Sequence, residues 1–250
     1  MRLGKFKFLL SFTLILFLYG CVSKPQTGYE KQQGNKTQWY YHEVGAEIKP
    51  DPEIVKVIEP YKVQLEKEMK TVIGYAETDL TRGKPEGTLG DFVADAMLET
   101  ARKFIPQTDC AITNNGGLRA PIFKGNIKVE NIFNLMPFAN RIVILEFSGK
   151  DFIELIRQIV ENGGEPVSNL TITVTDGLIE AYVGDKKVED YKTYKVATID
   201  YLWKGGGSMP LMKKGKLVKD TKVLLREALI EYVKEHKKIN QKIEGRIVIQ

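Results

Sequence analysis

Two short segments carry the side chains best suited to hold a small polar ligand. The first is Asn114-Asn115-Gly116-Gly117-Leu118-Arg119, and the second is Met136-Pro137-Phe138-Ala139-Asn140. Glycines let a backbone approach a ligand closely, asparagine offers a donor and an acceptor, and the arginine fork matches pairs of phosphate or sugar oxygens. The alternative interpretation of the first segment is a strand end with a tight turn and a surface arginine.

The elements around these segments must position them. Residues 108–113 combine small and β-branched apolar side chains, which predicts a short buried strand that opens into the first segment. Because predicted strands and helices alternate without a strict βαβ repeat, we expect an α+β fold with mixed sheets. Further strands are predicted over 71–77, 141–147, 170–175, 178–183 and 194–199, hairpin turns at Asp176-Gly177 and Gly184-Asp185, and helices over 89–104, 150–161 and about 222–236.

A chain of 250 residues holds one good core or at most two small domains. Residues 21–51 mix Ser, Gln, Gly, Lys and Pro with little apolar periodicity, which predicts a tether before a single domain over 52–250. Trp39-Tyr40-Tyr41-His42 interrupts this tether, and these aromatics either dock on the folded body or stay exposed. From Pro52, apolar residues recur at three- and four-residue steps and predict an amphipathic helix, which Pro60 should kink or split in two.

The N-terminus has the pattern of a signal peptide. Three basic residues precede a largely apolar run over 8–19, which is shorter than the roughly 20 residues of a membrane span. Leu18-Tyr19-Gly20-Cys21 resembles a bacterial lipobox, which implies cleavage of residues 1–20 and a lipid anchor on Cys21. An uncleaved N-terminal anchor is the alternative. In either case we expect the rest of the chain in the cell envelope, outside the cytoplasm.

Removal of residues 1–20 would lower the net charge from +5 to about +2, because they hold three basic and no acidic residues. The charge therefore does not indicate a nucleic-acid binder, and we expect no nucleic-acid partner. The lysines of 213–219 and of the last helix are expected on a solvated surface. With Cys21 lipidated, Cys110 has no intramolecular partner, and its place in a predicted strand favours a buried structural thiol.

A series of short motifs extends over residues 53–250. In chain order they are Val72-Ile73-Gly74, Glu86 to Ala96, Asn114 to Arg119, Pro121-Ile122, Gly125-Asn126-Ile127, Asn134 to Asn140, Ser148-Gly149-Lys150, Tyr194 to Thr198, Gly205-Gly206-Gly207 and Gly245-Arg246-Ile247. Together they resemble the C-terminal, substrate-recognition domain of bacterial and animal 5'-nucleotidases. Ordered motifs that agree over such a length indicate a fold more strongly than any single one. The resemblance implies the mixed-sheet α+β fold of that domain.

The resemblance also implies roles for individual residues. Phe138 would stack on one face of a nucleobase, and Tyr201, six residues before Gly207, would stack on the other. The alternative is that both rings belong to the core. Asn114 and Asn140 would meet the base edge, and Arg119 the ribose and phosphate side.

Two positions depart from the family pattern. Arg82 lies near the place of a ligand-binding arginine of the family but not in register, so a solvated loop arginine is the alternative. Where the family usually has Gly-Gly-Asp-Gly, this chain has Gly205-Gly206-Gly207-Ser208. The carboxylate expected to accept hydrogen bonds from ribose hydroxyls is therefore missing. Either Ser208 or Asp200 partly substitutes for it, or ribose recognition is weaker, or the ligand is not a standard ribonucleotide.

Catalysis needs residues that these motifs do not supply. Family members that hydrolyse nucleotides carry a metallophosphatase domain, whose two metals need several Asp, His and Asn ligands. The 250 residues contain only His42 and His236, in the tether and in a basic helix, and these cannot build such a site. No nucleophile motif such as Gly-x-Ser-x-Gly is present. We therefore expect recognition without bond cleavage, no cofactor or metal bound by this chain, and divalent metals only in a partner.

Three functions are compatible with this pattern. The first is a lipid-anchored nucleotide-recognition subunit that acts with a separate metallophosphatase as a split 5'-nucleotidase in nucleotide catabolism. The second is a lipoprotein that binds nucleosides or nucleotide sugars alone. The third is a structural envelope protein whose pocket has decayed, which the missing acid at Gly207 motivates.

Overall fold

The computed structural model describes residues 29–33, 36–40, 45 and 48–250. The chain divides into two units, Met1–Glu59 and Pro60–Gln250. In the first unit, β1 (Tyr29–Gln33) and β2 (Lys36–Tyr40) form an antiparallel pair within the segment predicted as a tether. The predicted signal peptide and Cys21 lie outside the described residues.

Helix α1 (Pro52–Met69) contains residues of both units, and none of its residues is buried. It runs without interruption through Pro60, so it is not split in two there. A proline removes one backbone hydrogen bond from a helix, and the remaining bonds on both sides hold α1 together.

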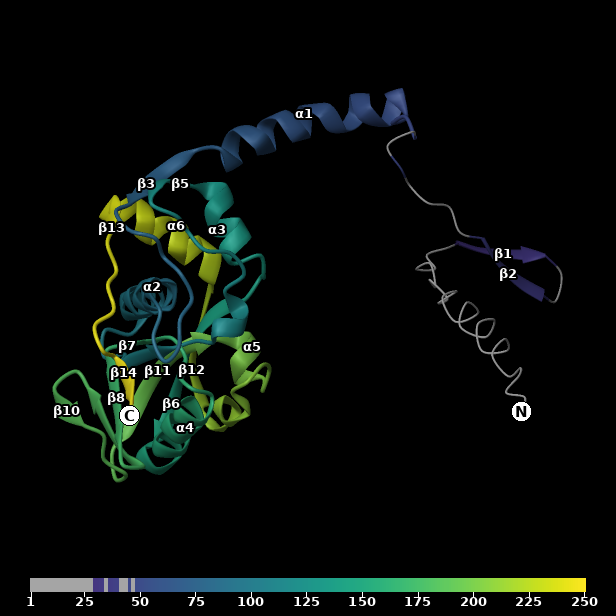
Figure 1. The fold of residues 1–250 in the computed structure, drawn as a ribbon. Coiled ribbons are helices and arrows are strands. Elements are labelled where there is room, and N and C mark those ends of the chain that lie inside the picture. The colour runs from purple at the N-terminus through teal and green to yellow at the C-terminus, as the bar shows by residue number, and fades with distance from the viewer. Residues whose placement is uncertain (1–28, 34–35, 41–44, 46–47) are drawn as a thin grey trace, which may run out of the picture. The chain divides into compact units, whose positions relative to one another are not determined.

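The second unit is built on a mixed five-stranded sheet (Figure 1). Its strand order is β12-β6-β11-β4-β7. Strand β11 pairs antiparallel with β6 and parallel with β4, so the predicted mixed sheet is confirmed. The five strands are β4 (Cys110–Ile112), β6 (Arg141–Ser148), β7 (Val167–Ser168), β11 (Thr193–Ile199) and β12 (Lys216–Leu224).

Helices cover both faces of this sheet. The consecutive residues 142–145 of β6 are all buried, and successive side chains of a strand point to opposite faces. Helices α2 (Thr88–Phe104) and α4 (Gly149–Glu161) both contact β6 and β11, and α6 (Leu225–His236) packs against α2. Figure 1 shows α2 at the centre of the unit, where eleven of its residues are buried. The core therefore lies between the sheet and these helices.

Two smaller sheets complete the second unit. One has the order β13-β3-β5, and the other has the order β10-β9-β8-β14. A short helix, α3, directly follows β5 along the chain. Asp176 and Gly177 both have positive φ, 51° and 77°, as a two-residue type I′ hairpin requires, which confirms the predicted turn between β8 and β9. The bounds are β3 (Val72–Ala76), β5 (Gly125–Lys128), α3 (Val129–Leu135), β8 (Leu170–Thr175), β9 (Leu178–Val183), β10 (Lys186–Lys187), β13 (Lys238–Ile239) and β14 (Ile247–Ile249).

Strand β12 was missed by the sequence interpretation, and the helix predicted from about 222 begins at Leu225. This strand is at the edge of its sheet, and most of its residues are exposed or half-buried. An edge strand tolerates charged side chains, so its lysines suggested a surface segment instead.

Cys110 is a free thiol with no exposed surface, which confirms the predicted buried thiol.

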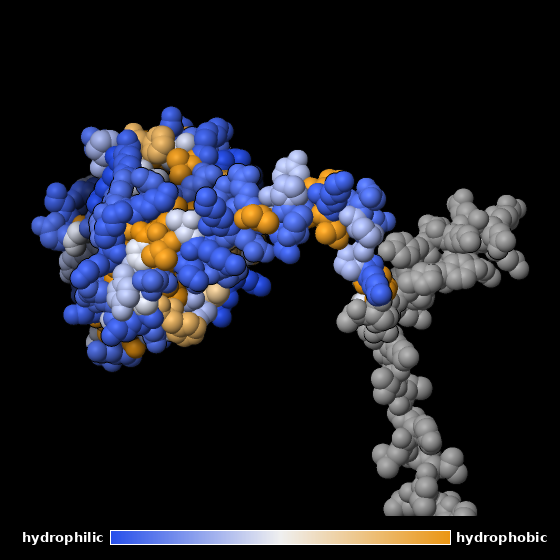
Figure 2. All heavy atoms as spheres, turned by 90° about the horizontal axis from the view of Figure 1, so that it is seen from above, coloured by the Kyte–Doolittle hydropathy of each residue, from blue (hydrophilic) through white to orange (hydrophobic). Residues whose placement is uncertain are grey.

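The face of the second unit seen in Figure 2 is mostly hydrophilic, with small, separate apolar patches. Scattered apolar groups of this kind are usual on folded domains. None of the helices within the described residues is both long enough and apolar enough to span a membrane.

Arg246 connects the C-terminal segment to α2 through a cluster of acidic residues. Its guanidinium forms two bonds of 2.7 and 2.9 Å to the carboxylate of Asp95 and lies 3.8 Å from Asp91. The carboxylate of Glu86 accepts the backbone N–H groups of Glu244 and Arg246. Asp91 is 2% exposed, and this burial raises its pKa to about 8, although Arg246 acts in the opposite direction.

Replacing Asp91 by asparagine is expected to change how stability depends on pH. Because the pKa of Asp91 in the folded state is raised from 3.8 to about 8, the stabilisation from this proton is complete below about pH 4. It is lost as the pH rises toward 8. Asparagine stays neutral, so the parent should lose unfolding free energy relative to Asp91→Asn by up to about 1.4 kcal/mol per pH unit, on the order of 5 kcal/mol over this range. Thermal unfolding of both proteins from pH 4 to 8 measures this difference.

Asp151→Asn is the matched control for this comparison. Asp151 is partly exposed, and the hydroxyl of Ser148 and the ammonium of Lys214 hold its pKa below the ordinary value. Its contribution is therefore lost only as the pH falls below about 4, so the difference between the parent and this control should stay nearly constant from pH 4 to 8. A difference between parent and Asp91→Asn that stays constant across the range would contradict the neutral state of Asp91.

Candidate functional site

Three loops meet at one edge of the five-stranded sheet because of its strand directions. Strands β4 and β11 are parallel neighbours, so the loops that follow them emerge on the same side. Strand β6 is antiparallel to β11, so the loop that precedes β6 emerges there too. These loops enclose a cavity of about 410 Å³. It is lined by Asn114, Gly116, Gly117, Arg119, Phe138, Asn140, Ile199, Tyr201, Gly207 and Ser208.

The first loop places an amide in the cavity wall. Residues Asn115–Gly117 form a single 3₁₀ turn, η1, closed by the N–H of Gly117 on the carbonyl of Asn114 at 3.2 Å. Asn114 is 6% exposed, and its Oδ1 is buried without a hydrogen-bond partner among the described residues. An unpaired buried acceptor is costly, so this arrangement of the loop lowers the stability of the fold.

Arg119 supplies positive charge at the rim. Its side chain is exposed, while its backbone N–H donates to the carbonyl of Leu135 at 2.9 Å. Its guanidinium carbon lies 6.0 Å from the centre of the Phe138 ring. Arg119 is the one cationic residue among those that line the cavity in the described part of the chain, so this side suits an anionic group.

Two half-exposed aromatic rings border the cavity, Phe138 at 41% and Tyr201 at 48%. Tyr201 lies in α5 (Asp200–Trp203), directly after β11. A Cβ atom on Gly206 would lie 2.4 Å from Cε2 of Tyr201, so only glycine lets this loop backbone pack against the ring. Both rings line the cavity and keep accessible surface, so neither is a core residue and each is available for stacking.

The glycine-rich loop borders the cavity next to Asn114. Gly207 has φ +67°, and a Cβ added there would lie 3.2 Å from Nδ2 of Asn114. Ser208 lines the cavity and donates its hydroxyl proton to the carboxylate of Glu165 at 2.7 Å. The loop continues into a 3₁₀ turn, η2 (Pro210–Lys214).

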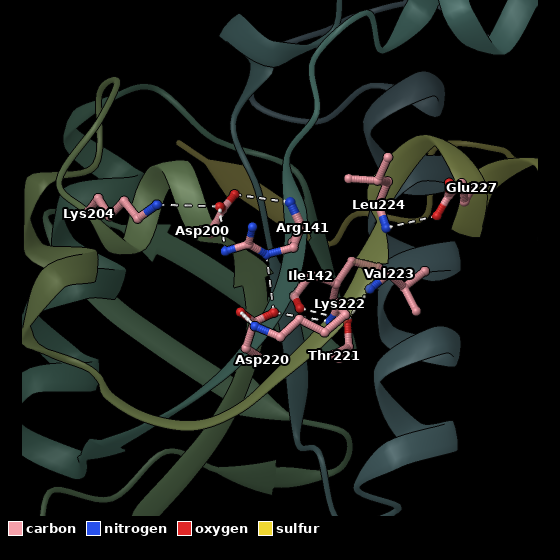
Figure 3. Close-up of polar contacts among 10 residues, drawn as sticks. All are labelled: Arg141, Ile142, Asp200, Lys204, Asp220, Thr221, Lys222, Val223, Leu224 and Glu227. Carbon is pink, nitrogen blue, oxygen red and sulfur yellow. Dashed lines mark hydrogen bonds and ion pairs between the residues drawn. The ribbon is translucent and has the colours of Figure 1, made fainter.

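An ion-pair cluster holds two of the three loops together (Figure 3). Arg141, directly after Asn140, donates its backbone N–H to Asp200 at 3.0 Å, and its guanidinium lies 3.5 Å from the same carboxylate. Asp200 directly precedes Tyr201. Asp220 pairs with the other side of Arg141 at 3.3 Å, and Lys222 and Arg141 hold the pKa of Asp220 below its ordinary value. The cluster therefore sets the positions of Asn140 and Tyr201 relative to each other.

The structure brings together most of the residues that the sequence singled out. Asn114, Arg119, Phe138, Asn140, Tyr201 and Gly207 all line the cavity. Gly205 and Gly206 belong to the glycine-rich loop but do not line the cavity. Arg82 is exposed and does not line the cavity, and Asp200 is bound in the Arg141 cluster, so only Ser208 remains as a substitute for the missing acid. Cys21 lies outside the described residues.

Two contributors were not found from the sequence. Ile199 lines the cavity as the last residue of β11, where a strand pattern gives no sign that a side chain is functional. Glu165 lies behind Ser208 and is 4% exposed. An isolated acid between two glycines and a proline offers no motif that would mark it. No group of three or more metal-ligating side chains occurs within the residues that the structure covers.

Comparisons with known proteins agree with this geometry. The chain is 31% identical over 220 residues to the trifunctional nucleotide phosphoesterase protein YfkN of Bacillus subtilis, covering 79% of this chain and 15% of that protein. It is 30% identical over 233 residues to the cell wall protein Lmo0130 of Listeria monocytogenes, covering 80% and 28%. The crystal structure of the 5'-nucleotidase precursor from Thermus thermophilus superposes with a TM-score of 0.67 at 27% identity, covering 80% and 44%.

The chain spans less than half the length of each of these relatives. The family model described as the 5'-nucleotidase, C-terminal domain, matches residues 72–214, more than half of the chain. This range contains every residue that lines the cavity. The chain therefore belongs to the 5'-nucleotidase C-terminal domain family.

Proposed function

We propose that this chain recognises a nucleotide or nucleoside in the cavity between the three loops. The observation that carries the proposal is the cavity itself, which is lined by Asn114, Arg119, Phe138, Asn140 and Tyr201 together. Its volume of about 410 Å³ is within the range of small-molecule sites, roughly 300–1,000 Å³. The wall combines aromatic faces, amides and one cation, which are the groups that a base, a sugar and a phosphate require.

Each group has a role in this proposal. The rings of Phe138 and Tyr201 stack on the two faces of the base, because every base presents an apolar π-face. The amides of Asn114 and Asn140 pair with the polar edge of the base. Arg119 donates hydrogen bonds to the phosphate or sugar oxygens at the rim.

In the same proposal, the chain is the substrate-binding half of a split 5'-nucleotidase. A separate metallophosphatase supplies the two metals and the attacking water, while this chain orients the nucleotide. The matching family model, which describes the C-terminal domain of 5'-nucleotidases, and the relative named as a nucleotide phosphoesterase support this arrangement.

The proposal places the chain in the cell envelope, attached to a membrane by lipid on Cys21. The basic and apolar N-terminal pattern and the lipobox-like Leu18-Tyr19-Gly20-Cys21 support this location. The relative named as a cell wall protein supports it too.

Ligand-dependent unfolding of the full chain in detergent tests recognition. We expect nucleosides, nucleotides or nucleotide sugars to raise the melting temperature of the parent. At a hundred times the dissociation constant a ligand adds about 2.7 kcal/mol, or roughly 5–10 °C for a unit of this size. Phe138→Ala should reduce this shift, whereas Phe123→Ala, which removes a 67% exposed ring that does not line the cavity, should keep it. A panel without any stabilising ligand would overturn the proposal.

Mixing tests the split arrangement separately. The full chain and a metallophosphatase from the same cell are each assayed alone and together, with Mn²⁺, against a panel of 5'-nucleotides. We expect phosphate release to appear or to rise strongly only in the mixture, and Phe138→Ala to reduce that rise. If the mixture is no faster than the metallophosphatase alone, the chain binds nucleotides without such a partner.

A further inference from the structure

Glu165 is a buried carboxylate behind the cavity wall, in the segment between α4 and β7. It is 4% exposed. Its Oε2 accepts the backbone N–H of Asn115 at 2.7 Å, and its Oε1 accepts the hydroxyl of Ser208 at 2.7 Å. Nδ2 of Asn162 approaches Oε1 at 3.4 Å and donates to the carbonyl of Ser208 at 3.0 Å. One carboxylate therefore joins the loop after β4 to the glycine-rich loop.

The contact with Glu165 fixes the direction of the Ser208 hydroxyl proton. A hydroxyl has one proton, and a carboxylate can only accept, so the proton of Ser208 points toward Glu165. Ser208 also lines the cavity. Its oxygen therefore offers lone pairs, and no proton, to a ligand.

Asn114 lies next to the loop that carries Ser208. Its Oδ1 is buried without a partner among the residues described and lies on the side of Gly117, where an added Cβ would be 3.2 Å away. Gly207 lies against the Asn114 amide, where an added Cβ would be 3.2 Å from Nδ2, so the glycine-rich loop that carries Ser208 packs directly on Asn114. The Ser208 oxygen is an acceptor, so it suits a ligand group that donates protons and does not suit a phosphate, which must accept them.

We infer that Glu165 is a positioning residue that makes Ser208 an acceptor for a hydroxyl group of the ligand sugar. The inference rests on the proposed function and adds to it a preference for ligands that carry sugar hydroxyls. The ligand hydroxyl donates to Oγ of Ser208, Oγ donates to Glu165, and the backbone N–H of Asn115 holds the far side of the carboxylate. A site built around such an acceptor discriminates against a ligand that lacks the hydroxyl.

Glu165→Gln tests this role. Glutamine has the size of glutamate and can still join the two loops, but it reverses the direction of the hydrogen bond with Ser208. The glutamine carbonyl can accept from Asn115 while its NH₂ donates to Ser208, and the hydroxyl proton of Ser208 then turns into the cavity. Ser208→Ala removes the acceptor without touching Glu165. Glu154→Gln, on the exposed side of α4, is the matched control.

The measurement compares dissociation constants of the full chain for AMP, GMP, CMP and UMP with those for the 2',3'-dideoxy forms of the same nucleotides. We expect the parent to prefer a ribonucleotide about five- to tenfold, as one hydrogen bond provides. Glu165→Gln and Ser208→Ala should bring this ratio close to one while leaving the dideoxy affinity within about twofold of the parent's. Glu154→Gln should keep the parental ratio.

The contrary outcomes separate this inference from the function on which it rests. Equal binding of ribo and dideoxy forms by the parent overturns the hydroxyl subsite and leaves nucleotide recognition standing. If Ser208→Ala weakens the binding of ribo and dideoxy nucleotides equally, the contact between Glu165 and Ser208 has only a structural role. Absence of binding to every nucleotide of both series removes the proposed function itself. If Glu165→Gln unfolds, Ser208→Ala alone decides between these outcomes.

Discussion

Replacing Arg246 by leucine is expected to lower the unfolding free energy by about 3–5 kcal/mol, the usual cost of removing one partner from a buried ion pair. The side chain of Arg246 is 13% exposed and contacts the carboxylates of Asp95 and Glu244 and the carbonyl of Val167. Without it, Asp95 would remain partly buried, with Ser168 and Gln241 as its side-chain donors among the residues that the structure describes. Urea unfolding at pH 7 measures this loss from the midpoint and slope.

Arg157→Leu is the matched control for this prediction. Arg157 lies on α4, pairs with Glu154 three residues earlier, and is 52% exposed. Exposed pairs contribute roughly 0–1 kcal/mol, so the control should stay close to the parent. Arg246→Lys should fall between the two, because lysine keeps a charge but loses the paired geometry that binds Asp95. If Arg246→Leu is no less stable than the control, the acidic cluster does not stabilise the fold.

The elements that were predicted correctly have local signals of their own. The β8–β9 hairpin follows from Asp176-Gly177, and α4 begins after Ser148, whose hydroxyl accepts the N–H of Asp151 at 3.2 Å as an N-cap. Short elements lack such signals. β7 has two residues, and β12 is an edge strand rich in lysine, so pairing with distant strands decides their conformation.

Most residues that line the cavity could also be predicted from local sequence signals, but the contacts that support them could not. The family resemblance marks loop residues such as Asn114, Phe138 and Tyr201, and the parallel pairing of β4 with β11 brings them to one edge. No sequence motif predicts a contact between two loops that are distant in sequence. Glu165 meets Asn115 and Ser208 across 50 and 43 residues, and Asp200 meets Arg141 across 59. Only the folded chain shows that Asp200 supports the site and that Ser208 faces it.

The largest effect on ligand binding is expected from removing both rings at the cavity. Phe138 and Tyr201 line it from different loops, and each retains more than two fifths of its surface. Stacking contributes roughly 1–3 kcal/mol per contact. Phe138→Ala and Tyr201→Ala should therefore each raise the dissociation constant of the tightest nucleotide in the panel by roughly 5- to 100-fold. Isothermal titration calorimetry of the full chain in detergent measures these constants.

The double variant decides whether the rings hold opposite faces of one base. Rings that stack independently on two faces give losses of binding free energy that add, so Phe138→Ala with Tyr201→Ala should weaken binding by roughly 25- to 10⁴-fold. Tyr201→Phe keeps the ring and should stay within about threefold of the parent. Phe123→Ala should also bind as the parent does, since that exposed ring does not line the cavity. A double variant no weaker than either single variant would mean that the two rings do not enclose a common base, and the ligand would then lie along one ring only.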